Sequence, residues 1–174
     1  MIYRYLPLCA GVALLAGCSA SPNMSLGTAD NSFIMQAASG GLSEVLLGQM
    51  AQEKAVNPAV KQLGAQMVQD HTPADKELVA LAMKKGVTPP TSPDVAQTAV
   101  SQQLSTLSGV TFDQQYLASQ QQDHQLQVKL YQDEAQNGTD PDIRAFATTN
   151  LPMLQRHLQE VQAVMPTSTA SPAG

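Results

Sequence analysis

Apolar residues recur every three or four positions over four long stretches of the chain, which is the spacing of one face of a helix. The first stretch begins near Asp30, in a run of residues that favour helix N-termini, and ends just before Pro58. The second continues to Gly86, where two lysines followed by glycine are typical of a helix end. The alternation expected of strands is nearly absent, so the pattern predicts an all-α chain.

The second half of the sequence repeats this arrangement. A proline-rich crossover at 88–93 and a shorter helix at about 94–107 are followed by long helices at about 111–136 and 140–164. Four amphipathic helices with two short turns and one long crossover predict a ferritin-like four-helix bundle. It would consist of two helical hairpins, joined by a crossover that carries a short extra helix.

The N-terminus follows another pattern. After Arg4 comes an apolar stretch that is too short to span a membrane, and it ends in Leu15-Ala16-Gly17-Cys18. This ending resembles the bacterial lipobox, which implies cleavage before Cys18 and covalent lipid, including palmitate, on that cysteine. A residue other than aspartate after the cysteine implies an outer-membrane lipoprotein that faces the periplasm. An ordinary signal peptide with a chance cysteine is the alternative.

These patterns divide the chain into a signal peptide at 1–17, a lipidated tether at 18–29, a four-helix bundle domain at 30–165 and a disordered tail at 166–174. Of the two cysteines, Cys9 is lost with the signal and Cys18 is used by lipid, so the bundle has no disulfide. A net charge of −5 and the absence of tryptophan argue against nucleic acid as a partner. The membrane, reached through the lipid, is the predicted partner.

The three histidines fall on the inner faces of three different predicted helices, and a glutamate occupies that face of the fourth. Glu44 and His71 lie almost equally far from the first turn, as do His124 and His157 from the second, so all four can meet at mid-bundle. Imidazole and carboxylate ligands suit zinc, copper, nickel or iron. We therefore predict one transition-metal ion on these four residues, with zinc foremost.

Other interpretations of the same residues stay open. A hydrogen-bonded polar layer that fixes helix register would also place them on inner faces. A di-iron oxidase centre is disfavoured, because it needs Glu-x-x-His and the residues three before each histidine are Val68, Gln121 and Leu154. Six methionines of the bundle could ligate copper, but they more often fill gaps in a core. A metal-dependent oxidoreductase would need an open coordination position, which sequence does not show.

Two further features lie beside the histidines. Asp70 and Asp123 each precede one, and because adjacent helical residues point about 100° apart, each is expected to face a neighbouring helix or solvent. A supporting role toward a histidine of another helix is possible. Pro73 and Pro152 lie within predicted helices, where they predict either a kink or a helix that restarts, with Thr72 as its cap.

Three motifs together resemble the bacterial family called domain of unknown function 4142. They are Met67-Val68-Gln69-Asp70-His71, Phe112-Asp113-Gln114-Gln115-Tyr116-Leu117 before His124, and Leu151-Pro152-Met153-Leu154 before His157-Leu158. The resemblance implies an exported, often lipid-anchored, ferritin-like protein in which Glu44 and the three histidines are the polar motif positions. It implies no reaction, since the family is named for lacking one.

The functional hypothesis is a lipid-anchored bundle that binds one metal ion, with a role in metal handling or envelope stress. The alternative is a structural or interaction module without metal. No nucleophile with an adjacent base and no phosphate-binding loop occurs in the sequence, so we predict no catalytic residues.

Overall fold

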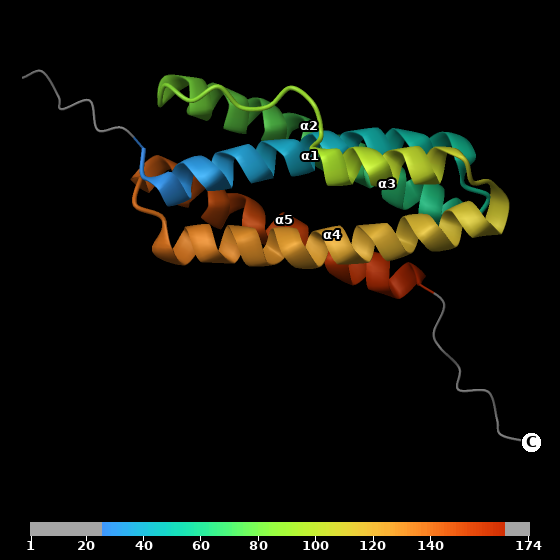
Figure 1. The fold of residues 1–174 in the computed structure, drawn as a ribbon. Coiled ribbons are helices and arrows are strands. Elements are labelled where there is room, and N and C mark those ends of the chain that lie inside the picture. Colours follow the sequence, from blue (N-terminus) through green and yellow to red (C-terminus); the bar gives the residue numbers. More distant parts are fainter. Residues whose placement is uncertain (1–25, 166–174) are drawn as a thin grey trace, which may run out of the picture.

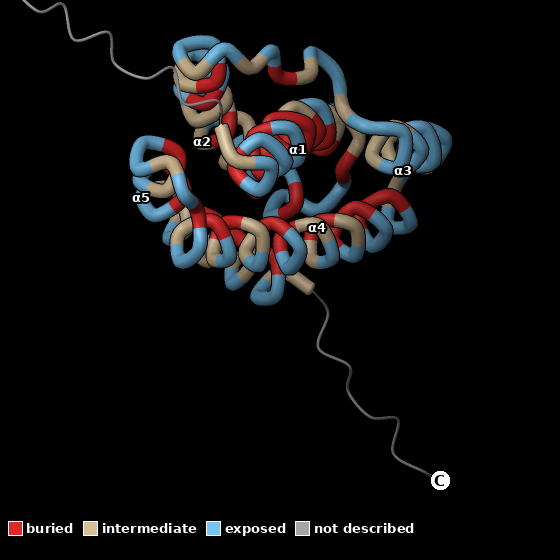
Figure 2. The backbone as a smooth tube through the Cα atoms, turned by 60° about the vertical axis from the view of Figure 1, so that its left-hand side comes forward, coloured by how far each residue is buried: buried red, intermediate tan, exposed pale blue. Residues whose placement is uncertain are grey.

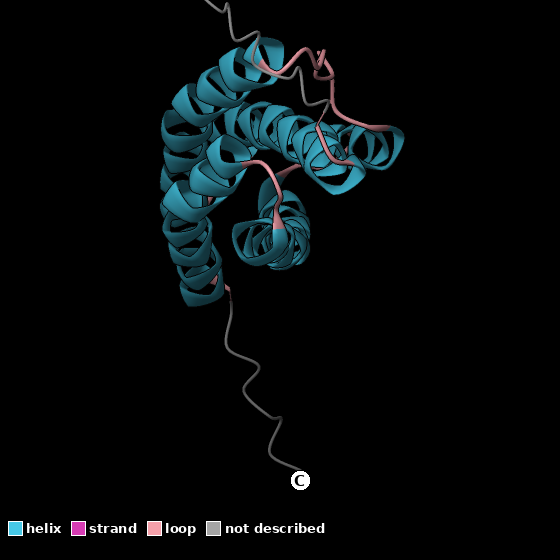
Figure 3. Cartoon of the chain, turned by 90° about the vertical axis from the view of Figure 1, so that its left-hand side faces the viewer, coloured by secondary structure: helices cyan, strands magenta, loops and turns pink. Residues whose placement is uncertain are grey.

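The computed structural model describes residues 26–165, and these residues form five helices joined by loops (Figures 1 and 3). The helices are α1 (Thr28–Lys54), α2 (Pro58–Lys84), α3 (Val95–Ser105), α4 (Gly109–Asn137) and α5 (Pro141–Val164). The predicted all-α, four-helix bundle with an extra helix in the crossover is confirmed. The predicted signal peptide, Cys18 and the tail from 166 lie outside the described residues.

The long helices form two antiparallel hairpins, α1 with α2 and α4 with α5, which pack against each other through α1–α4 and α2–α5 contacts. The crossover from α2 runs back along the bundle, and α3 lies beside α1 and α4 (Figures 1 and 2). The described chain therefore starts and finishes at opposite ends of the bundle (Figure 1). No helix among residues 26–165 is both long enough and apolar enough to cross a membrane.

The helix ends follow the capping residues of the sequence in most places. The Asn57 side chain accepts a hydrogen bond from the Ala59 amide at the start of α2, and Asp94 forms a capping box with Gln97 at the start of α3. Gly86 follows α2 with a φ of 77°, a left-handed conformation that glycine adopts without strain.

The predicted start of the first helix near Asp30 is wrong by two residues. α1 begins at Thr28, and its first turn receives no side-chain cap. The Asp30 carboxylate is used elsewhere: it accepts hydrogen bonds from the backbone amide (2.8 Å) and the hydroxyl of Thr139, in the turn between α4 and α5. Aspartate is a favourable N-cap residue, but Asp30 instead forms a tertiary contact that the sequence pattern does not reveal.

Both internal prolines lie inside continuous helices, so the alternative of a restarted helix is not observed. Thr72 does not cap a new helix, and its hydroxyl donates instead to the Val68 carbonyl at 2.6 Å. Such a bond within the helix is compatible with a continuous α2.

Close packing of the first hairpin depends on two facing glycines. A Cβ placed on Gly48 would come within 2.6 Å of the Gly64 carbonyl oxygen, and a Cβ on Gly64 would meet the Gly48 carbonyl at the same distance. Since real Cβ atoms do not approach backbone so closely, only glycine at both positions lets α1 and α2 cross here.

The buried side chains form two hydrophobic clusters, one toward each end of the bundle. One includes Phe33, Tyr131 and Phe146, and the other includes Met67 and Phe112. Between them along the helices lies a layer of buried polar side chains, namely Ser39, Ser43, Glu44, His71, Gln120, His124, Gln127 and His157. The functional candidates all belong to this layer.

Candidate metal centre

The structure brings the three histidines together in the polar layer. His71 on α2, His124 on α4 and His157 on α5 have ring centroids 6.0, 5.3 and 5.4 Å apart, a nearly equilateral triangle. All three are buried, and His124 and His157 have no exposed surface. We call this group the histidine triad.

The triad offers one ligand atom from each ring, and these atoms lie within 4.8 Å of one another. Nitrogens that share one tetrahedral ion lie roughly 3.5 Å apart, so the three rings would move closer together to hold one. The ring nitrogens His71 Nε2, His124 Nε2 and His157 Nδ1 are buried and have no hydrogen-bond partner among the described residues. Three buried ring nitrogens without a hydrogen-bond partner are suited to share a cation when they are unprotonated.

The orientation of His157 is fixed by an aspartate of another helix. His157 Nε2 lies 2.8 Å from Asp70 Oδ2 on α2, as expected if Asp70 faces a neighbouring helix. Gln66 and Arg156 donate to the same oxygen at 2.7 and 2.8 Å. Burial by itself would raise the pKa of Asp70, but these hydrogen bonds outweigh it and lower that pKa. An ionised Asp70 accepts a hydrogen bond from His157 Nε2–H, which leaves Nδ1 unprotonated and able to bind a metal.

His124 is oriented by its own helix. Its Nδ1 lies 3.0 Å from the Gln120 carbonyl oxygen one turn earlier, which assigns the proton to Nδ1 and the lone pair to Nε2. The two histidines thus expose different nitrogens, and each tautomer is set by an acceptor outside the triad. This is the arrangement in which metal-binding histidines are usually held.

Burial lowers the pKa of all three histidines, and in His71 the charges of His124 and His157 lower it further. The rings are therefore neutral at pH 7, the form that binds a metal. Neutral rings keep the lone pairs that a metal would use, so no proton has to be released from them when an ion binds.

The fourth predicted ligand, Glu44, lies in the same layer but in an adjacent group. It forms a second set of ligand atoms within 4.8 Å with Asp123 and His124, whereas the triad is complete without it. Glu44 is 1 % exposed and accepts a hydrogen bond from the Gln120 side chain at 3.3 Å. We call Glu44 and Asp123 the carboxyl pair.

Burial raises the pKa of Asp123 well above its usual range, and the charge of Glu44 raises it further. Burial also raises the pKa of Glu44, to about 7, although the hydrogen bond from Gln120 opposes the rise. Both carboxyls are thus shifted toward their protonated forms, and Glu44 Oε2 and Asp123 Oδ2 have no hydrogen-bond partner among the described residues.

Sequence reasoning expected Asp123 to face a neighbouring helix or solvent but did not name it as a ligand, and it did not single out Asp75. Asp123 points about 100° away from His124 along α4, which directs it to α1 and so to Glu44. Asp75 lies one turn after His71, and its carboxyl occupies the space beside Gly41, where a Cβ would meet it at 1.8 Å. The spacing of four from a predicted ligand, opposite a glycine of the facing helix, is a signal that could have identified Asp75.

A family model matches most of the chain, and a match of that length establishes the family. The family described as "Domain of unknown function (DUF4142)" matches residues 16–164. The chain belongs to this family. The predicted resemblance is thereby confirmed, and no curated protein matches the chain.

Solved structures with the same arrangement of helices include proteins with bound metal. A DUF305 fragment from Deinococcus radiodurans has a TM-score of 0.71 at 14% identity, over 81% of this chain and 97% of that one. CopM in an Ag-bound form has a TM-score of 0.63 at 18% identity, and CopM in the Cu(II)-bound form has 0.62 at 16%, each over 77% of this chain and 93% of that one. At these identities the likeness shows the shared helical fold.

Proposed function

We propose that this protein binds one late first-row transition-metal ion through His71, His124 and His157. The observation that carries the proposal is the convergence of three neutral, fully or nearly fully buried imidazoles whose free nitrogens have no donor among the described residues. The hydrogen bond from His157 to Asp70 supports it, because it orients a ligand from outside the site.

Among the ions that imidazole suits, we put copper(II) first. The order of affinities at nitrogen sites places Cu²⁺ above Zn²⁺, and the fold is shared with CopM in its Cu(II)-bound and Ag-bound forms. Sequence alone favoured zinc, which stays as the competing ion of the test. When bound, such an ion would be held by His71, His124 and His157, with Asp70 increasing the donor strength of His157.

The proposed setting is outside the cytoplasm. The lipobox-like ending at Cys18 supports an outer-membrane lipoprotein that faces the periplasm, and metal handling or stress tolerance in the envelope is the role we propose there. Mass spectrometry of the protein from its native membrane tests the anchor, since a triacylated Cys18 as first residue is expected. An N-terminus without lipid would contradict this part of the proposal.

Metal analysis tests the site directly. Purified protein is loaded separately with Cu²⁺ and Zn²⁺, desalted and analysed for metal, with His71→Ala as the variant and Gln69→Ala, an exposed position of the same helix, as its control. We expect one ion per chain in the wild type and the control, a preference for Cu²⁺ in competition, and none in His71→Ala. Absence of metal from the wild type would overturn the proposal.

The hydrogen-bonded layer is the competing outcome. If the polar residues only set helix register, His71→Ala would lower the melting temperature by the same amount with and without added metal. Under the proposed function, added metal raises the melting temperature of the wild type and leaves the variant unchanged.

A further inference from the structure

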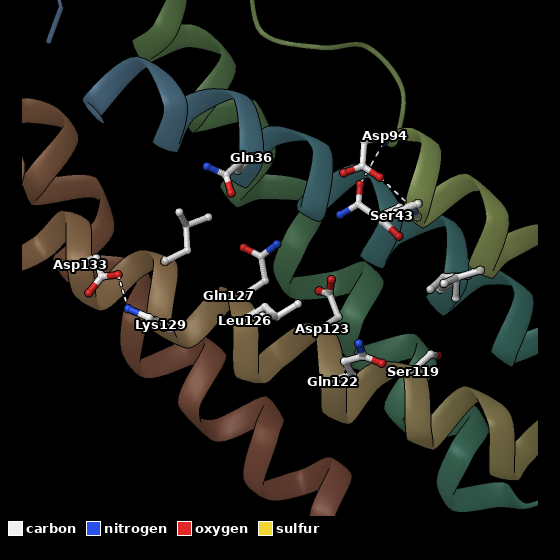
Figure 4. Close-up of a pocket in the computed structure, with 15 residues that line it drawn as sticks. Gln36, Ser43, Asp94, Ser119, Gln122, Asp123, Leu126, Gln127, Lys129 and Asp133 are labelled. Atoms are coloured by element: carbon white, nitrogen blue, oxygen red, sulfur yellow. Dashed lines mark hydrogen bonds and ion pairs between the residues drawn. The ribbon is translucent and has the colours of Figure 1, made fainter. Parts of the chain in front are cut away.

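A groove of about 460 Å³ opens between α1, α3 and α4 (Figure 4). Asp123 and Gln127 extend into it from α4, and Asp94 lies across from them at the start of α3 (Figure 4). Asp123 both lines this groove and belongs to the group with Glu44 and His124. The groove therefore reaches the polar layer at Ser43 and Gln127, and it reaches the group around Glu44 through Asp123.

The inner end of the groove offers unused ligand atoms. Glu44 Oε2, Asp123 Oδ2 and His124 Nε2 are buried without hydrogen-bond partners among the described residues. Glu44 is 1 % exposed and His124 is fully buried, so their polar atoms find no compensation in solvent. Two carboxylate oxygens and an imidazole nitrogen within 4.8 Å of one another form a ligand set of their own.

The charge of the groove suits a cation. Its lining contains Asp94, Asp123 and Asp133 but only one basic side chain, Lys129, which is paired with Asp133 at 2.6 Å. With Asp133 paired to Lys129, the Asp94 carboxylate still gives the groove a net negative charge, which favours cations over anions.

We propose that this groove is the route by which a metal ion reaches the histidine triad, and that Glu44, Asp123 and His124 form a separate holding position at its inner end. The inference rests on the proposed function of the triad. His124 belongs to both ligand groups. An ion on the carboxyl pair can therefore keep His124 as a ligand while its carboxylate ligands are exchanged for His71 and His157.

Blocking the groove from its rim tests the route without altering a ligand. Ala96 lines the groove and is exposed, so Ala96→Trp narrows the groove, whereas Val95, 89 % exposed and outside the lining, gives the matched control Val95→Trp. Metal-free protein is mixed rapidly with Co²⁺, whose visible absorbance reports imidazole coordination. We expect slower uptake in Ala96→Trp only, with the same final occupancy in both. Equal rates in the two variants would overturn the route.

Neutral replacements test the holding position. Asp123→Asn and Glu44→Gln are expected to slow Co²⁺ uptake about tenfold, the scale on which charges in a groove change association rates. Release to a chelator is expected to slow as well, which leaves the dissociation constant within a few-fold. Glu53→Gln, an exposed position of α1, is the control and should leave both rates unchanged.

The possible results separate the two proposals. A weaker equilibrium affinity with an unchanged uptake rate would make the carboxyl pair part of the final site and overturn the holding position. Full occupancy in every variant at the wild-type rate would overturn the route but keep the function of the triad. A wild type that binds no Co²⁺, Cu²⁺ or Zn²⁺ at equilibrium would overturn both.

Discussion

The two halves of the polar layer differ in chemistry and in access. The histidine triad lies among α2, α4 and α5 and is oriented by acceptors at its periphery, Asp70 and the Gln120 carbonyl. The carboxyl pair lies between α1 and α4 and meets the groove at Asp123. One helix, α4, serves both halves, because consecutive residues of a helix point to different neighbours. One turn of α4 thus supplies both His124 to the buried triad and Asp123 to the groove.

Burial drives the two halves toward uncharged forms by opposite proton movements. It lowers the pKa of the histidines, which lose a proton, and raises the pKa of Glu44 and Asp123, which gain one. The layer can therefore lie between two hydrophobic clusters at little electrostatic cost. It also presents unpaired imidazole nitrogens on one side and carboxyls shifted toward their protonated forms on the other, so the two sides would differ in how firmly they hold an ion.

The largest predicted effect is the loss of a triad ligand. His157→Ala should weaken metal binding by at least about 100-fold, since removing a ligand costs more than removing its supporting hydrogen bond. Glu44→Gln should weaken it by less than tenfold, on the order expected of a residue outside the final site. Competition with a chromophoric chelator measures both dissociation constants. An equal loss of metal affinity in His157→Ala and Glu44→Gln would mean that the histidine triad and the carboxyl pair form a single site.

Removal of the acceptor behind His157 should have the next largest effect. Asp70→Asn takes away the carboxylate that fixes the His157 tautomer, and we expect an affinity loss of about 10- to 100-fold. Arg156→Gln leaves Asp70 and its bond to His157 in place, so it serves as the control, with a change of only a few-fold expected. The same titration applies. If Arg156→Gln lowers the metal affinity as much as Asp70→Asn does, the charges around Asp70 rather than the tautomer of His157 determine that affinity.

The carboxyl side has a neighbour whose effect depends on pH. Burial raises the pKa of Asp75 from 3.8 to about 7, so the stability that its protonated form contributes is present below pH 3.8 and is lost as pH rises through 7. Asp75→Asn does not titrate, and its melting temperature relative to the wild type should increase by several degrees between pH 4 and pH 8. Thermal melts of metal-free protein measure this. A constant difference across that range would contradict the raised pKa.

The smallest predicted effect concerns Tyr116. Its hydroxyl is buried without a partner among the described residues, and the charge of Glu44 adds to the burial that raises its pKa. Tyr116→Phe removes a polar atom that makes no bond, so the free energy of unfolding should change by less than about 1 kcal/mol. Chemical denaturation is the measurement. A large decrease in the free energy of unfolding would mean that the Tyr116 hydroxyl forms a hydrogen bond with the carboxyl pair.

The helices and the meeting of the histidines follow from sequence, because helical periodicity fixes which residues face inward and the two short turns fix their height. Periodicity does not tell which of the inward-facing polar residues contact one another within the layer. It therefore did not show that Glu44 would lie with Asp123, on the α1 side, apart from His71 and His157. That separation depends on the rotation of α1 about its own axis, which the close glycine contact with α2 helps to set. Whether the four predicted residues bind metal stays a prediction.

The contact between Asp30 and Thr139 has a mechanical consequence. It fastens the first turn of α1 to the turn between α4 and α5, at the end of the bundle where the described chain begins. A force applied at the start of α1 would have to break the hydrogen bonds between Asp30 and Thr139 before α1 could separate from its neighbouring helices. Because α1 contributes Glu44, this contact would protect the carboxyl pair from force if Cys18 carries the proposed lipid anchor.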